Sequence, residues 1–91
     1  MPKELEIEIG KILANGINEP FTPDLFDFIY DELTKNVIII IKSKKSVNIH
    51  EDGIMESYDE ALERVYDILD EHGVVYDGIL QNPEEVPIES A

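Results

Sequence analysis

Cysteine is absent from the 91-residue chain, and so are long apolar runs. Without cysteine no disulfide can form, so the fold does not depend on an oxidising compartment. The longest apolar run is Val37 to Ile41, whereas a membrane-spanning helix needs about 20 apolar residues. The opening residues lead directly into acidic positions and lack the apolar stretch of a secretory signal peptide. We therefore expect a cytoplasmic protein with no membrane partner.

Basic residues are scarce and unevenly placed. Lysine and arginine number 7 against 21 aspartates and glutamates, a formal net charge of −14. A surface this acidic repels phosphate backbones, so direct binding to nucleic acid is not expected. Residues 1–50 carry a net charge of −2 and residues 51–91 a net charge of −12. Four of the lysines form a small basic corner: Lys35, Lys42, Lys44 and Lys45. We expect a basic protein partner, steered by this asymmetry.

The length and composition fit one folded unit. A second hydrophobic core would need roughly 50 more residues, and 43% hydrophobic with 31% charged residues is typical of a globular protein. We predict a small single α+β domain over residues 1–80, with two or three helices packed on a small sheet. Residues 81–91 contain two prolines and few apolar side chains, and we predict that they form a loosely ordered acidic tail.

Two helices are predicted from capping signals and apolar spacing. The first covers Ser57 to about His72: Ser57 and Glu60 have capping-box spacing, and Gly73 offers a left-handed stop. Its buried face would consist of Tyr58, Ala61, Leu62, Val65, Ile68 and Leu69. The other covers residues 22–36, where Thr22 would cap the helix and Pro23 suits its first turn. Its buried face would consist of Leu25, Phe26, Ile29 and Leu33.

Three strands are predicted. Val37 to Ile41 is a run of β-branched residues, which favour a pleated sheet, and we predict a central strand covered on both faces. A turn at residues 43–45 would lead into a second strand, Ser46 to His50, in which apolar and polar residues alternate. Val74 to Leu80 is predicted as a third strand.

The first residues fit two structures. Glu4 to Ile9 alternates as a strand would, but apolar residues also form one helical stripe that leaves Ile7 outside it: Leu5, Ile9, Ile12 and Leu13. We favour the helix. The strand alternative would give the order β-α-β-β-α-β of a ferredoxin-like domain.

A row of carboxylates is the clearest candidate site. Asp59, Glu63, Asp67 and Glu71 recur every four residues, so they would stack on one helix face roughly 6 Å apart. Further acidic residues, Asp70, Glu60 and Glu56, widen the row. One interpretation is a merely solvated face. The functional one is a rigid acidic surface that docks on a basic groove, as proteins that imitate DNA do; this is an analogy of charge and size.

No catalytic or metal site is predicted. His50, Glu51 and Asp52 are adjacent, and on an extended chain they would point in alternating directions. His72 lies at the end of a predicted helix, where an imidazole complements the dipole. We therefore predict no enzyme activity, no cofactor and no bound metal. Phe28 and Tyr66 lie off the main apolar stripes; we favour packing in a second layer for both, and the alternative is that they are exposed interface anchors.

These patterns lead to two functional hypotheses. The first is an acidic protein-binding module that binds a basic protein such as a nucleic-acid enzyme; a nucleic-acid-mimicking inhibitor is one protein of this kind. The residues that would bind the partner are Asp59, Glu63, Asp67, Asp70 and Glu71. The second is a structural or assembly subunit that forms a homodimer through a strand edge. The small size, heavy acidity and absence of cysteine would suit a phage or mobile-element product.

Overall fold

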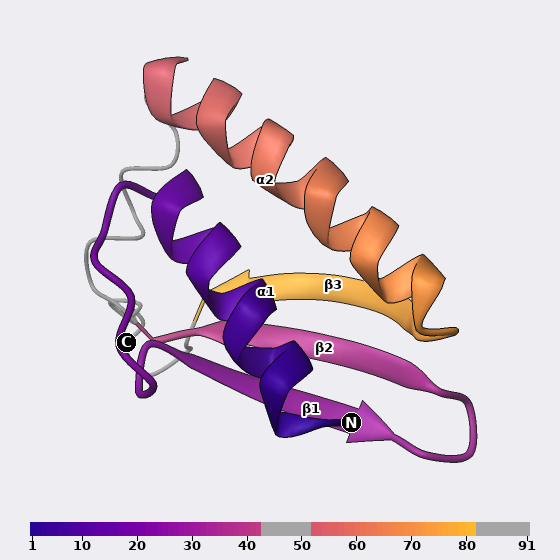
Figure 1. The fold of residues 1–91 in the computed structure, drawn as a ribbon. Coiled ribbons are helices and arrows are strands. Elements are labelled where there is room, and N and C mark those ends of the chain that lie inside the picture. The colour runs from indigo at the N-terminus through magenta and orange to yellow at the C-terminus, as the bar shows by residue number, and fades with distance from the viewer. Residues whose placement is uncertain (43–51, 82–91) are drawn as a thin grey trace, which may run out of the picture.

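The computed structural model describes residues 1–42 and 52–81, and in the second stretch the side chains of residues 57–80. The chain forms, in order, α1 (Lys3–Gly16), β1 (Phe26–Asp31), β2 (Asn36–Ile41), α2 (Asp52–Glu71) and β3 (Val75–Gln81). The sheet has the order β1-β2-β3, in which β1 pairs antiparallel and β3 pairs parallel with β2. Both helices lie on the same face of this mixed sheet (Figure 1). The α+β class, with two helices on a small sheet, is thereby confirmed.

The first helix, α1, confirms the favoured prediction for the start of the chain. Leu5, Ile9 and Leu13 are at most 3% exposed, whereas Ile7 is 37% exposed, as a single helical stripe requires. Glu4 and Glu6 lie in the first turn, where carboxylates complement the positive end of the helix dipole. The strand alternative for residues 4–9 is wrong, and the ferredoxin-like order is excluded with it.

The long helix α2 is confirmed in its buried face and its end, but its predicted start is wrong. It begins at Asp52, so Ser57 lies inside the helix and does not cap it; the apolar and acidic spacing continues upstream of Ser57 and extends the helix. Gly73 has a φ of 70°, the left-handed conformation expected of a helix stop. The N–H of Val74 donates to the carbonyl oxygen of Leu69 at 2.9 Å, which closes the last turn.

The predicted helix over residues 22–36 is wrong, because this segment forms β1 and a turn into β2. Its apolar residues also have a period of two: Phe26 is buried, and Phe28 and Tyr30 are half-buried on the face toward the helices. Pairing with the β-branched strand β2 buries that face better than an isolated helix could. Leu33, expected to be buried, is 95% exposed in the turn, where its N–H donates to Asp31 Oδ1 at 2.9 Å.

The central strand β2 is confirmed. Val37, Ile39 and Ile41 are at most 2% exposed beneath the helices, and Ile38 and Ile40 on the other face are half-buried. A cover on both faces was expected, but within residues 1–42 and 52–81 the helices cover only one (Figure 1). The predicted third strand is confirmed as β3, one residue further along. The predicted turn at 43–45 and strand at 46–50 lie outside the described residues.

The two helices approach each other closely at Gly16. A Cβ built on Gly16 would lie 2.7 Å from the Cβ of Ala61 and 3.3 Å from the carbonyl oxygen of Ser57. Only a glycine lets the end of α1 pack this closely on α2. The contact joins the helices into one layer, and the core lies between that layer and the sheet.

Candidate acidic interface

The carboxylates predicted to bind a partner lie on the solvent face of α2. Asp59, Glu63, Asp67, Asp70 and Glu71 are all exposed. The opposite face of the same helix is buried, with Val65 at 0% and Leu69 at 1% exposure. Because the buried face fixes how the helix is rotated, the carboxylates must point away from the sheet. We call these five residues the acidic face.

No described cation neutralises the acidic face. Among residues 1–42 and 57–80, the one ion pair joins Lys42 Nζ to Asp27 Oδ1 at 3.7 Å, on the sheet rather than on α2. The described side chains of α2 include a single basic residue, Arg64, which is exposed. Like charges at four-residue spacing cost a few tenths of a kcal/mol per pair. The helix therefore keeps this charge at a small cost in stability.

An exposed aromatic residue borders the acidic face. Tyr66 is 47% exposed, and its ring packs edge-on against Tyr76 of β3, with the ring centroids 4.8 Å apart and the planes at 76°. Tyr66 therefore packs on a neighbouring ring and is also partly exposed, and a role as an interface anchor stays a prediction. Phe28, the second aromatic considered as an exposed anchor, is half-buried.

Burial keeps the neighbouring phenols protonated. Desolvation, with smaller contributions from the nearby Tyr66 and Asp59, raises the pKa of Tyr58 to about 12. Desolvation also raises the pKa of Tyr76, with added contributions from Tyr58 and Tyr66. An ordinary phenol is already neutral at physiological pH, and burial extends the neutral range of these two tyrosines to higher pH.

The described residues include one of the two histidines. His72 is exposed just after α2, and His50 and Glu51 lie outside the described residues. Within the described ranges, no group of three or more histidines and acidic residues is arranged to hold a metal ion. Neither helix in the part of the chain that the structure describes combines the length and the hydropathy needed to cross a bilayer.

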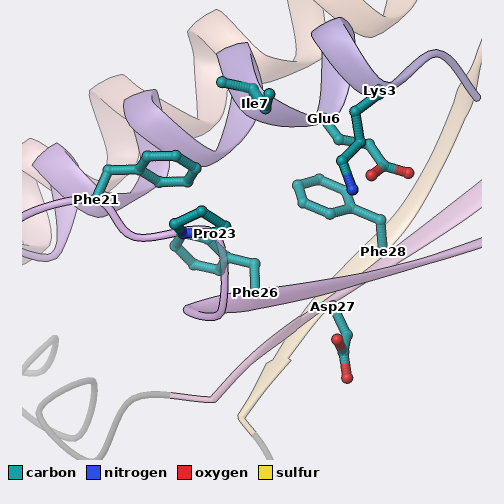
Figure 2. Close-up of a pocket in the computed structure, with 8 residues that line it drawn as sticks. All are labelled: Lys3, Glu6, Ile7, Phe21, Pro23, Phe26, Asp27 and Phe28. Atoms are coloured by element: carbon teal, nitrogen blue, oxygen red, sulfur yellow. The ribbon is translucent and has the colours of Figure 1, made fainter.

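A hollow between α1 and β1 was missed by the sequence analysis. It has a volume of about 260 Å³ and is lined by Lys3, Glu6, Ile7, Phe21, Pro23, Phe26, Asp27 and Phe28 (Figure 2). Because residues 22–36 are predicted as a helix, the alternation of Phe26, Phe28 and Tyr30 is not used to predict a strand there. That alternation is the signal that could have placed two aromatic rings on one face of a strand.

Comparison with protein-family models, with curated proteins and with solved structures finds no match to this chain.

Proposed function

We propose that this protein is an acidic protein-binding module that docks the acidic face of α2 on a basic partner, and that it acts as a nucleic-acid-mimicking inhibitor of a nucleic-acid-binding protein. The observation that carries the proposal is the set of exposed carboxylates on one side of a helix that is buried on its other side. Within the described residues none of the five is neutralised by an ion pair.

The geometry of α2 suits recognition of a basic groove. Its carboxylates are spaced roughly 6 Å apart along the axis, so the surface presents a regular line of charge, as a phosphate backbone does. The core holds the helix in place, so little conformational entropy is lost on binding. The net charge of −14 would accelerate encounter with a cationic partner. Tyr66 offers an aromatic contact beside the charges, of a kind enriched among residues that dominate binding energy.

Charge reversal on α2 tests the proposal. The triple variant Asp59→Lys, Glu63→Lys and Asp67→Lys changes only exposed side chains, so it should fold, and it should lose capture of basic proteins from the host lysate. The matched control reverses three exposed carboxylates away from α2, namely Glu4→Lys, Glu8→Lys and Glu32→Lys. Both variants have the same net charge, so a difference between them reports the position of the charge.

The measurement is quantitative recovery of bound proteins at low and at high salt, followed by elution with duplex DNA. We expect the wild type and the control to retain the same nucleic-acid-binding proteins, released by salt and by DNA, and the α2 variant to lose them. Equal recovery by the α2 variant would show that the acidic face is not the binding surface.

A second candidate function is self-association of an assembly subunit. It is favoured by apolar side chains on the sheet face turned away from the helices, where Ile29, Val75 and Leu80 are 51%, 54% and 54% exposed. The strands β1 and β3 are also the two edges of the sheet, and unpaired edges are common sites of association.

A further inference from the structure

The hollow between α1 and β1 lies beside β1, which is an edge strand of the sheet formed by the described residues. β1 pairs with β2 on one side only, so along its other side alternate backbone N–H and C=O groups have no partner strand within the described residues. Figure 2 shows that α1 passes over this strand, with Ile7 above the hollow and Phe26 and Phe28 directed toward the helix. An edge strand with a helix above it forms a groove that fits an extended peptide.

The size and lining of the hollow indicate what would enter it. Its volume of about 260 Å³ is below the roughly 300–1,000 Å³ of pockets for drug-sized ligands, so it has room for one large side chain. Five of the eight lining residues are apolar, namely Phe21, Phe26, Phe28, Ile7 and Pro23, and the other three, Lys3, Glu6 and Asp27, are charged. The ring of Phe21 packs directly on Gly10, where the absence of a Cβ leaves room for it.

The two faces of β1 differ in polarity, which would give a bound strand an alternating pattern. Phe26, Phe28 and Tyr30 share the face toward α1, whereas Asp27, Ile29 and Asp31 share the opposite face. In Figure 2 Asp27 points away from the hollow. A strand added beside β1 would place every second residue opposite one of these sets. Apolar residues would face the hollow, and basic residues would lie near Asp31; Asp27, on the same face as Asp31, already pairs with Lys42 at 3.7 Å.

We propose that the free edge of β1 binds an extended basic segment of a partner protein, which adds a fourth strand and inserts one apolar side chain into the hollow lined by Phe21, Phe26 and Phe28. The charges commit the site to a basic segment. Asp24 and Asp31 are exposed just before β1 and at its end, and the strand contains no lysine or arginine. Asp27 is already paired with Lys42, and at the hollow the charge of Lys3 is offset by that of Glu6. A second copy paired antiparallel about Ile29 would bring Asp27 against Asp31, which is unfavourable for directly opposed residues. This site is separate from the acidic face of α2 and does not depend on it.

The test begins with a display library of random linear peptides screened against the full-length protein. We expect enrichment of peptides in which lysine or arginine alternates with apolar residues, one of them large. An enriched peptide is then synthesised and its affinity measured for two variants. Ile7→Glu places a charge at the hollow on a residue outside the buried stripe of α1, and Leu33→Glu makes the same change at a 95% exposed position in the turn.

Ile7→Glu should weaken binding about tenfold or more, as loss of an anchor contact does, and Leu33→Glu should leave binding unchanged. Both variants add one negative charge, so simple attraction of a basic peptide would make both bind more tightly. Amide hydrogen exchange on the wild-type complex should show new protection in β1. A peptide with alternate amides N-methylated should bind much more weakly, because it cannot pair along the strand edge.

Several results would overturn the proposal. These are enrichment without the alternating pattern, equal affinity for Ile7→Glu and wild type, protection in α2 rather than β1, or a homodimer of this chain that pairs at the same edge. The α2 charge-reversal triple variant should keep peptide binding within a few-fold. Failure of the acidic-face proposal and failure of the β1 proposal are therefore distinguishable.

Discussion

At the scale of single residues, the tyrosines beneath α2 link stability to alkaline pH. Tyr58 is 9% exposed. Burial is the largest cause that raises the pKa of its phenol to about 12, whereas the pKa of a tyrosine in an unfolded chain is about 10. The hydroxyl of Tyr76 is buried with no hydrogen-bond partner among the described residues, and burial also raises the pKa of this phenol. The folded state therefore holds these protons more tightly than the unfolded state does.

The sign of the pH dependence follows from these shifts. The stabilising contribution is fully present below about pH 10, and it falls as the pH rises from about 10 toward 12, because the unfolded state loses its protons first. The free energy of unfolding should fall by up to about 1.4 kcal/mol per pH unit for each phenol involved. Urea unfolding at several pH values measures this fall in stability directly, and the absorbance of phenolate shows at which pH the tyrosines lose their protons.

The variants Tyr58→Phe and Tyr76→Phe identify the source of the alkaline loss. Each should flatten the fall in stability between about pH 10 and 12, and the double variant should flatten it more than either alone. A fall of unchanged slope in the double variant would mean that other groups cause it.

At the scale of elements, the packing of α1 on α2 depends on the absence of a side chain at Gly16. A Cβ there would lie 2.7 Å from the Cβ of Ala61, closer than the atoms can approach, so the helices would have to separate. Overpacking of this kind costs about 1–3 kcal/mol, which exceeds the gain of up to about 1 kcal/mol from the helix propensity of alanine. Gly16→Ala should therefore destabilise the protein.

Gly78→Ala is the matched control. Nothing lies within 4 Å of a Cβ at Gly78, so this change should leave stability unchanged or raise it by up to about 1 kcal/mol. Chemical denaturation of both variants gives the comparison. Adding Ala61→Gly to Gly16→Ala should recover part of the loss, because it removes the opposing methyl group. Additive effects in that double variant would count against direct contact between the two positions.

At the scale of the whole molecule, net charge and the apolar sheet face oppose each other. A charge of −14 repels identical copies, and salt screens that repulsion. Side chains such as Val75 and Leu80, each 54% exposed, would favour contact between copies, and apolar contact strengthens in salts such as sulfate. The oligomeric state at two salt concentrations therefore separates the two functional candidates.

We expect light scattering to give the mass of one chain at low and at high salt, as the charge-docking proposal requires. A doubled mass that persists or grows in high salt would instead favour the assembly subunit. In that case Leu80→Lys should restore the mass of one chain if the sheet face forms the contact, and leave the dimer intact if a strand edge forms it.

Local patterns in the sequence were enough to predict the elements in which the apolar residues follow a single periodicity. Three elements are of this kind, because neighbouring residues alone favour one structure in each. They are α1 with its stripe of Leu5, Ile9 and Leu13, β2 with its run of β-branched residues, and α2 with one apolar and one acidic face. The same reasoning placed the acidic face in solvent, because the buried face of a helix fixes where its other residues point. The division into a domain over residues 1–80 and a tail over 81–91 stays a prediction.

Tertiary structure decided what two local patterns left open. Leu25, Phe26, Ile29 and Leu33 fit a helix, but Phe26, Phe28 and Tyr30 fit a strand equally well, and only pairing with β2 selects the strand. The sequence by itself determined which residues are apolar, which are charged and how they repeat along most elements. Only the packed structure brought α1 across β1 to form the hollow and joined Gly16 to Ala61, because both depend on contacts between residues far apart in the chain.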